Sequence, residues 1–179
     1  MGQYYKPIFL NDYGNPVKNW VYSHDYDSGL KLMEHSWMRN PMVNAVEHLL
    51  AEGQPFHKSK IVWSGDYADG ELKPDGTEGS NLYGLCEDDT KLRPDEVEPM
   101  MYQYLINHTK MEYVDKLKVP DKDGWRIHPL PLMTCEGNGR GGGDYRDEHP
   151  LIGSWARNKI SASNEIPNGY REIIFDIVE

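Results

Sequence analysis

One stretch of the chain carries apolar residues at the spacing of an amphipathic helix. Between Asn40 and Gly53 they recur every three or four positions, while Glu47 and His48 fall off that stripe. Asn40 is a good N-cap, Pro41 suits the first helical position, and Gly53 is a typical stop. The pattern predicts a helix that begins at Pro41 and packs against a sheet. Its apolar stripe consists of Met42, Val43, Val46, Leu49 and Leu50.

Aromatic and β-branched runs separated by turn residues predict strands in much of the remaining chain. Residues 4–10 and 17–26 flank the segment NDYGNP and predict a hairpin, with Pro7 at an edge position or a bulge. Residues 60–64 predict a short strand. Residues 100–119 have helical propensity, but their alternation of aromatic and polar positions favours a second hairpin.

The two halves of the sequence resemble each other. Each opens on an aromatic hairpin, continues with an LxLM stretch at 30–33 or 130–133, and reaches a tryptophan beside a small residue, Trp63 or Trp155. We predict both LxLM stretches as strands, and a closing strand over 170–179. Such similarity indicates two supersecondary units packed about a pseudo-twofold axis.

The expected fold class is α+β, with a mixed, mainly antiparallel sheet of two hairpin-led pseudo-repeats and one clear amphipathic helix. The 179 residues are expected to form a single domain, with pseudo-repeat halves at 1–71 and 100–179. Residues 72–99 are polar, acidic and rich in Gly and Pro, which predicts a connector without a regular period. Its expected anchors to the body are Leu82, Tyr83 and Leu85.

The formal charge of −10 argues against non-specific binding to nucleic acid, which requires a basic footprint. It suits a soluble surface, or one that mimics nucleic acid or meets a basic partner. No apolar run has membrane-spanning length and the N-terminus resembles no targeting peptide, so a cytoplasmic protein without a membrane partner is expected. Cys86 and Cys135 are expected as free thiols, no zinc-type spacing occurs, and no cofactor is implied.

The sequence resembles a group of uncharacterised bacterial and phage proteins that begin with MGQYYK. The resemblance lies in the segments MGQYYK at 1–6, GLKLMEHS at 29–36, GDYAD at 65–69, GNGRGGGD at 137–144 and GSWA at 153–156. No activity is established for the group. The resemblance therefore implies a bacterial or phage origin and a bacterial cytosol, including that of a phage host, but no substrate. Residues 72–99 match no shared motif of the group.

The glycine-rich segment after Cys135 is the first candidate site. It matches G-x-G-x-x-G, but no apolar helix follows it, and no Lys-Ser or Lys-Thr completes a P-loop. Its glycines can still expose backbone N–H groups that converge on an anion, with Arg140 as a guanidinium for phosphate or carboxylate. Trp155 and Arg157 then offer a stacking face and a second cation. The alternative is a tight loop in which Arg140 pairs with Asp144.

The ligand-binding candidates from this segment and the stretch that follows it are Gly137, Asn138, Gly139, Arg140, Gly141, Gly142, Gly143, Asp144, Trp155 and Arg157.

Acidic residues after the strand at 60–64 supply a weaker catalytic candidate. Asp66, Asp69 and Glu71 are suited to Mg²⁺ or to acid–base chemistry, although loops rich in Asp and Gly are also ordinary turns. No nucleophile motif is present. Cys135 qualifies as a nucleophile only if the amides of the glycine segment lower the pKa of its thiol.

His35 is the second catalytic candidate. With His24, Asp25 and Glu34 it falls at the ends of adjacent predicted strands, where the four could form a metal or acid–base site or be satisfied by their neighbours. His57, His108 and His149 fall in predicted turns and are expected to be solvated.

Two classes of function fit these patterns. The first is a small-molecule binding protein, or an enzyme, that holds a phosphorylated or nucleotide-like ligand on the glycine-rich segment. The second is an interaction protein, such as a phage-encoded inhibitor of a host factor or host defence. It would work through its acidic surface and residues 72–99.

Overall fold

Strands from both halves of the chain join into one mixed, mostly antiparallel sheet in the computed structural model, which describes residues 2–137 and 149–178. Across the described residues the order is β4-β2-β1-β3-β8-β5-β6-β9, and β7 also pairs with β3. The strands are β1 (Tyr5–Leu10), β2 (Val17–Val21), β3 (Ser59–Gly65), β4 (Lys91–Leu92), β5 (Tyr104–Asn107), β6 (Glu112–Asp115), β7 (Cys135–Glu136), β8 (Lys159–Ser163) and β9 (Arg171–Glu172).

Short helices connect these strands. The α-helices are α1 (Leu32–His35), α2 (Pro41–Leu49) and α3 (Pro129–Thr134), and the 3₁₀ turns are η1 (Ser23–Tyr26), η2 (Asp88–Thr90) and η3 (Lys116–Lys118). Within residues 2–137 and 149–178, none of the helices has the length and apolar character needed to cross a bilayer. The predicted α+β class is confirmed.

Both predicted hairpins form. β1 and β2 pair antiparallel with a register shift between Phe9 and Leu10, and β5 pairs antiparallel with β6. The side chain of Asn107 closes the second turn, because its Oδ1 accepts from the N–H groups of Thr109 and Lys110. The edge position expected for Pro7 is wrong, since β1 is an interior strand and Pro7 lies opposite Trp63 on β3.

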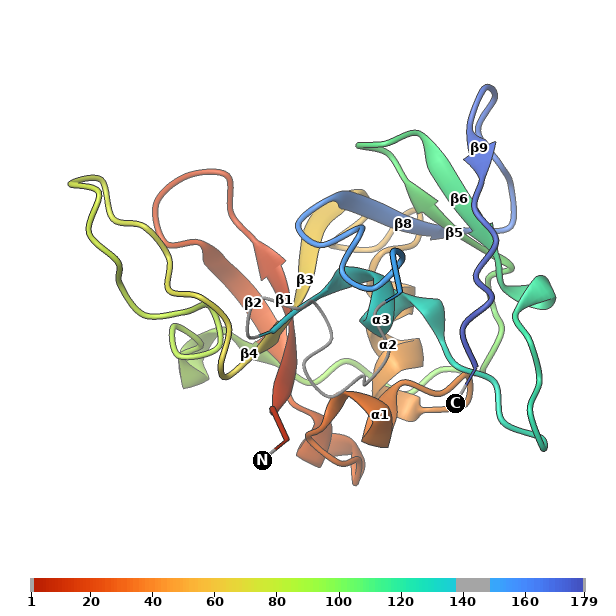
Figure 1. Ribbon diagram of the computed structural model, residues 1–179, viewed down its shortest axis with the longest axis horizontal. Coiled ribbons are helices and arrows are strands. Elements are labelled where there is room, and N and C mark those ends of the chain that lie inside the picture. Colours follow the sequence, from red (N-terminus) through yellow and green to blue (C-terminus); the bar gives the residue numbers. More distant parts are fainter. Residues whose placement is uncertain (1, 138–148, 179) are drawn as a thin grey trace.

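The two halves of the sheet have the same arrangement of strands, from each outer edge to the centre. In each half a hairpin leads, a helix follows, and a third strand returns antiparallel to the first strand of its hairpin, as β3 does to β1 and β8 to β5. A short strand then joins the outer edge in parallel, β4 beside β2 and β9 beside β6. β3 and β8 meet antiparallel at the centre, between the two wings seen in Figure 1.

Neither LxLM stretch forms a strand, so that prediction is wrong: helix α1 begins inside the first stretch, and the second is helical throughout. The stretch at 30–33 leads into α1, whose Glu34 carboxylate accepts from the backbone N–H of Lys31. The stretch at 130–133 lies in α3, where Pro129 occupies the first helical turn and suits it. Runs this short and this apolar fit a buried helix as well as a strand.

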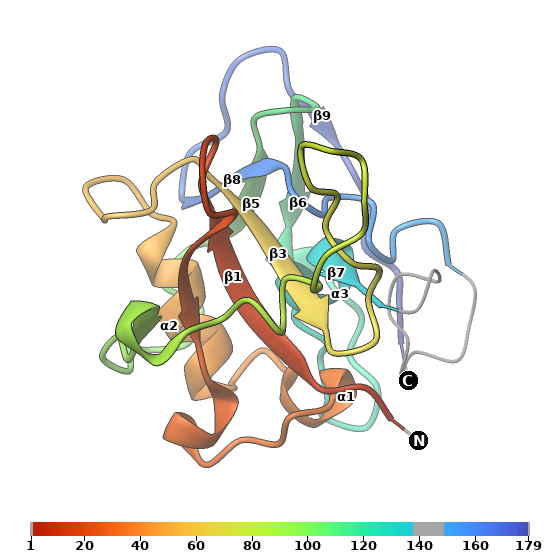
Figure 2. The same cartoon turned by 90° about the vertical axis from the view of Figure 1, so that its left-hand side faces the viewer.

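Helix α2 begins as predicted. The Asn40 side chain accepts from the N–H of Val43 at 3.1 Å, and Pro41 is the first helical residue. The helix ends at Leu49, and Gly53 adopts a φ of +80° in the turn beyond it. Figure 2 shows α2 beside the β1–β3 part of the sheet, where its apolar stripe joins the main core.

A second, smaller core lies under the connector. Leu82 is 1% exposed and packs with Ile8, Val17, Trp20 and Val62. Among the three anchors expected from the sequence, Leu82 is therefore the buried one. The backbone carbonyl of Glu87 also accepts from the indole N–H of Trp20 at 2.8 Å, which ties the connector to β2.

The closing segment is a strand only at Arg171–Glu172. Beyond it the residues still alternate between core and solvent as in a strand, with Phe175 and Ile177 in the core and Ile174 and Val178 exposed. The N–H of Ile173 still donates to the carbonyl of Tyr113, so the segment follows β6 beyond the regular pairing.

Glu47 is buried, although its place off the apolar stripe predicted a position on the polar face of α2. Its carboxylate accepts from Lys116 Nζ at 2.7 Å on both oxygens, and His128 Nε2 lies 2.9 Å from Oε2. His128 Nδ1 accepts from the N–H of Leu130, which places the imidazole proton on Nε2, facing Glu47. The buried group is therefore one ion pair plus one neutral imidazole.

Candidate functional site

The glycine-rich segment falls largely outside the described residues. Of its candidates, Asn138, Gly139, Arg140, Gly141, Gly142, Gly143 and Asp144 all lie there. The described candidates are Gly137, which follows β7, together with Trp155 and Arg157, which precede β8.

Arg157 is held between two carboxylates. Its guanidinium donates to Glu71 at 2.5 and 3.1 Å and to Glu136 at 2.6 and 2.9 Å. These hydrogen bonds, first from Glu71 and then from Glu136, raise the pKa of Arg157. The backbone of Arg157 has a φ of +63°, in the left-handed region that is common in turns. Its positive charge is already neutralised and is not free for an anionic ligand.

A cavity of about 740 Å³ adjoins this cluster. Among the described residues, its charged lining consists of Asp69, Glu71 and Glu136 against Arg157, three negative charges to one positive. Gly137 and Gly153 also line it. The described part of this cavity therefore repels phosphate and suits a cationic or neutral group.

Trp155 belongs to the core. Its side chain is 1% exposed, and its indole N–H donates to Glu112 Oε2 at 3.0 Å. Its backbone N–H donates to the carbonyl of Met133. Trp155 therefore holds α3 against β6 and presents no open ring face on which a base could stack.

Asp66 closes the end of the β1–β3 ladder. Its backbone N–H donates to the carbonyl of Tyr4 at 2.9 Å, and its Oδ1 accepts from the N–H of Tyr4 at 3.0 Å. The side chain of Asn81 donates to the carbonyl of Asp66. Asp66 thus joins the N-terminal strand to the connector, and Glu71 of the same acidic cluster binds Arg157 instead.

His35 is fully buried with both ring nitrogens engaged. Nδ1 lies 2.9 Å from the carbonyl oxygen of Gly29, and Nε2 accepts from the indole N–H of Trp63 at 2.9 Å. The proton is therefore on Nδ1. In this arrangement His35 joins α1 to β3 and has no surface exposed to solvent.

The other groups considered with His35 serve separate contacts. Asp25 pairs with Lys91 at 3.3 Å, and Glu34 caps α1. Throughout the described part of the chain, no group of three or more His, Cys, Asp or Glu side chains could hold a metal ion. Burial raises the pKa of the Cys135 thiol to about 12, so Cys135 is not a thiolate at neutral pH.

A second large cavity, with a mainly apolar lining, lies between the segment after α1 and the turn before α3. It measures about 680 Å³, and we call it the tryptophan groove. Trp37 and Trp125 stand edge to face, with ring centroids 5.1 Å apart. The groove is lined by Trp37, Met38, Arg39, Pro99, Met100, Asp121, Gly124, Trp125 and Arg126.

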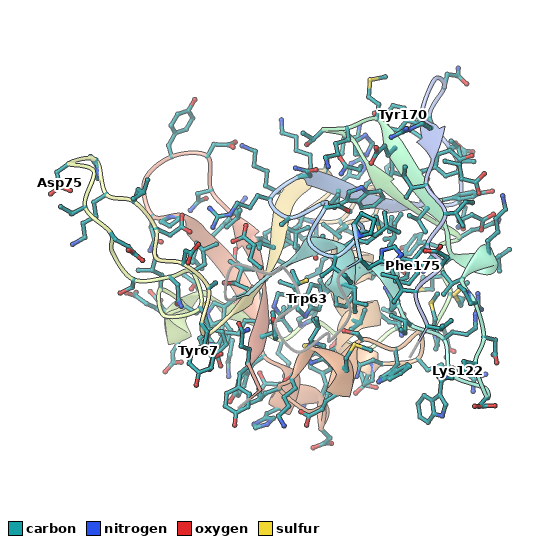
Figure 3. All side chains as sticks on the ribbon, in the orientation of Figure 1. Trp63, Tyr67, Asp75, Lys122, Tyr170 and Phe175 are labelled. Carbon is teal, nitrogen blue, oxygen red and sulfur yellow. The ribbon has the colours of Figure 1, made fainter. Side chains whose placement is uncertain are left out.

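Local backbone structure explains how the groove forms. The segment from Ser36 to Met38 pairs with residues 126–128, and the indole N–H of Trp37 donates to the carbonyl of Met33. A tight turn over 122–125 presents Trp125, which is 62% exposed. Figure 3 marks this turn by the label of Lys122, at the opposite side of the molecule from Asp75.

The groove carries a positive charge in an acidic protein. Arg126 and Arg39 line it against Asp121, whose Oδ1 accepts from the N–H of Gly124. The Arg126 guanidinium donates to the carbonyls of Lys116 and Val119. Arg39 is exposed and, among the described residues, has no hydrogen-bond or ion-pair partner. Of the two arginines that line the groove, Arg39 is the better placed to receive a ligand.

The sequence reasoning did not identify this groove. A local signal existed, because the DKDG turn directly before Trp125 would present the ring at a loop tip. Its proximity to Trp37 depends on the pairing of two segments about ninety residues apart, which no local pattern encodes.

No protein-family model matches the sequence of this chain, and neither a curated protein nor a solved structure matches it.

Proposed function

We propose that this protein binds a small anionic ligand with a flat aromatic part, such as a nucleotide-like or phosphorylated aromatic molecule, in the tryptophan groove. The observation that carries the proposal is the exposed ring of Trp125 beside Arg39 in a cavity of about 680 Å³. That volume lies within the range of about 300–1,000 Å³ that is usual for small-molecule sites.

The chemistry of the lining suits such a ligand. A base stacked on an aromatic side chain gains about 1–3 kcal/mol, and Trp125 leaves much of its ring exposed to water. A guanidinium binds phosphate or carboxylate with two parallel hydrogen bonds, and Arg39 has no competing partner in the part of the chain that the structure describes. The thioethers of Met38 and Met100 provide adaptable apolar walls.

The charge distribution favours the tryptophan groove over the cavity beside Arg157. The first has two arginines against one aspartate, whereas the second has three carboxylates against one arginine. Binding of an anion by Arg140 and the glycine amides remains a separate proposal from the sequence. The variant Arg140→Ala therefore accompanies the groove variants in the test below.

Titration with a panel of nucleotides, followed by tryptophan fluorescence and calorimetry, tests the proposal. Arg39→Ala is expected to weaken binding by about 10- to 150-fold, the value of a charged hydrogen bond. Trp125→Ala is expected to weaken binding by about 5- to 150-fold. It should also abolish the ligand-induced quenching of fluorescence that comes from Trp125. Arg93→Ala, an exposed arginine outside the groove, is the matched control and should bind as the wild type does.

Two outcomes would contradict the proposal that the ligand binds in the tryptophan groove. If Arg39→Ala and Trp125→Ala bind as tightly as the wild type while Arg140→Ala does not, the ligand sits on the glycine-rich segment. If no nucleotide or phosphorylated aromatic compound binds the folded wild type, the proposed ligand class is wrong.

The second proposal is an interaction protein that acts on a bacterial host factor through its acidic connector. A specific feature supports it. Residues 72–78 form a projecting finger, closed by a bridge between Leu72 and Glu78 and turning at Gly76, with Asp75 near its tip (Figures 1 and 3). Leu72 is 77% exposed at the base of the finger, where a partner that bound the connector would cover it.

Pull-down from a bacterial lysate at low and high salt tests this second proposal. We expect a partner that is retained at low salt, released at high salt, and lost in both Leu72→Ser and Asp89→Asn/Glu96→Gln. Arg39→Ala should retain the partner. Equal capture by all variants would exclude the connector as the binding surface.

A further inference from the structure

A serine, a histidine and a tyrosine from three distant segments form a hydrogen-bonded chain beside a small pocket. His108 Nε2 lies 2.6 Å from Ser161 Oγ, and His108 Nδ1 lies 3.0 Å from the hydroxyl of Tyr170. Ser161 and His108 both line a pocket of about 230 Å³. Tyr170 lies directly before β9, at the outer edge of its wing (Figure 3).

We propose that this pocket is a slow esterase site in which Ser161 is the nucleophile, His108 is its general base, and Tyr170 positions His108. The site is separate from the tryptophan groove and does not depend on it. Its substrate would be a small activated ester, because the pocket is smaller than the roughly 300–1,000 Å³ typical of drug-sized ligands.

The sheet fixes the geometry of the serine and the histidine. Ser161 on β8 lies opposite Ile106 on β5, so His108 is its diagonal neighbour on the same face of the sheet. The N–H of His108 donates to the carbonyl of Lys159, and Asn107 closes the turn beside it. Hydrogen-bonded backbone therefore holds both groups, with little freedom for the histidine to move away.

The hydrogen bonds allow the tautomer that a nucleophilic serine needs. A neutral imidazole has one N–H donor and one acceptor nitrogen. With the proton on Nδ1, His108 donates to Tyr170 and Nε2 accepts from the hydroxyl of Ser161. Tyr170 then occupies the place that a carboxylate has in a serine–histidine–aspartate triad. Unlike a carboxylate, its neutral hydroxyl orients the ring without adding a stabilising charge.

The electrostatics keep the imidazole neutral. Burial, followed by the nearby Lys58 and His57, lowers the pKa of His108 to about 4. The Nε2 lone pair is therefore available at neutral pH. A base this weak takes a proton less readily than one whose pKa matches the working pH, so turnover should be slow and restricted to good leaving groups.

Lys58 completes the pocket. Lys58 lines the cavity and has a backbone φ of +59°. Among the described residues its ammonium has no hydrogen-bond or ion-pair partner. An ammonium there can stabilise the oxyanion of a tetrahedral intermediate. Glu52 and Glu165 also line the pocket, so the substrate is expected to be uncharged rather than anionic.

The reaction has two balanced steps. Ser161 Oγ bonds to the acyl carbon while its proton moves to His108 Nε2, and the bond to the leaving alcohol then breaks as Nε2 returns that proton to it. Water next attacks the acyl–serine and gives a proton to Nε2. The acyl–Oγ bond breaks, the carboxylic acid leaves, and the proton returns to Ser161.

Hydrolysis of p-nitrophenyl acetate tests the proposal, with peptide mass mapping of the acetylated residue. The wild type should show a burst of nitrophenol and an acetyl group on Ser161. Ser161→Ala should abolish both, whereas Ser163→Ala, which alters the next serine of the same strand and pocket, should retain them. His108→Asn should lower the acylation rate by about 10²- to 10⁴-fold, the usual contribution of a general base.

The pH profile separates catalysis from chemical acetylation of surface amines. Because His108 has a pKa near 4, the Ser161-dependent rate should be flat from about pH 5 to pH 8, whereas reaction with lysines rises with pH. Tyr170→Phe should lower that rate while keeping the acetyl group on Ser161. Acetylation confined to lysines, or an equal burst in folded Ser161→Ala, would overturn the proposal. Far-ultraviolet circular dichroism establishes that each variant is folded.

Discussion

Replacing Lys116 with methionine is expected to lower the free energy of unfolding by about 3–5 kcal/mol near pH 7.5, the usual cost of leaving one partner of a buried ion pair alone. The Glu47 carboxylate would lose both of its 2.7 Å contacts with Lys116 Nζ while staying buried. Urea denaturation followed by circular dichroism measures the change. Lys118→Met is a matched control two residues away, because its pair with Glu172 is exposed and its loss should change the free energy of unfolding little.

The loss in Lys116→Met should shrink as the pH falls. In the wild type, burial lowers the pKa of His128, so the stability from its neutral form is present above pH 6.5 and is lost as the pH falls below that value. In the variant, protonated His128 can replace the missing cation beside Glu47. The variant should therefore lose less stability on acidification than the wild type does.

Below pH 4.5 a second group contributes in the wild type. Burial opposes ionisation of Glu47, but the adjacent His128 and Lys116 outweigh it, so the pKa of Glu47 is lowered. Its contribution to stability is lost as the pH falls from 4.5 toward that lower value. The double variant Lys116→Met/Glu47→Leu should recover most of the loss, because no uncompensated charge remains. If the stability lost in Lys116→Met is the same at every pH, protonated His128 does not compensate for the missing lysine charge.

Replacing His35 with leucine is expected to lower the free energy of unfolding by about 2–4 kcal/mol, because buried polar groups lose their partners. The indole N–H of Trp63 would lose its acceptor, and the carbonyl of Gly29 would lose its donor. Thermal and urea unfolding, read by the emission of the buried tryptophans, measure the effect. His24→Leu is the control, since His24 is exposed and should change stability by less than about 0.5 kcal/mol.

A double-mutant cycle assigns the loss to the hydrogen bond itself. Trp63→Phe removes the indole donor, so His35→Leu should cost less in that background than in the wild type. Strictly additive losses would mean that His35 stabilises α1 by packing alone. A catalytic role for His35 would instead require activity to vanish in His35→Gln while stability is retained.

The sequence predicted the elements that local chemistry determines. Asn40 and Pro41 define the start of α2 because a cap and a proline act within one turn. The two hairpins followed from strand alternation across turn residues. The LxLM stretches were assigned wrongly because tertiary burial, rather than periodicity, decides the structure of so short an apolar run.

Side chains that meet across the sheet escaped prediction for a different reason. Glu47 was placed on the polar face of α2, since nothing near it in the chain reveals Lys116, 69 residues away. His108 was expected to be solvated, yet its partners Ser161 and Tyr170 are 53 and 62 residues away. Arg157 was expected as a free cation, but Glu71 and Glu136 neutralise it. Such contacts depend on strand order, which turn and capping patterns do not encode.

The mirrored order of the strands bears on how such a chain could arise. A half-length ancestor that paired with a copy of itself, β3 against its counterpart β8, would produce this sheet once the two genes were fused. Fusion frees each copy to change without the other. Among the described residues, α2 and the His108–Ser161 pair occur in one half alone, and the finger at 72–78 lies in the connector between the halves. These features are then later acquisitions, and specialised roles are best sought in such departures from symmetry.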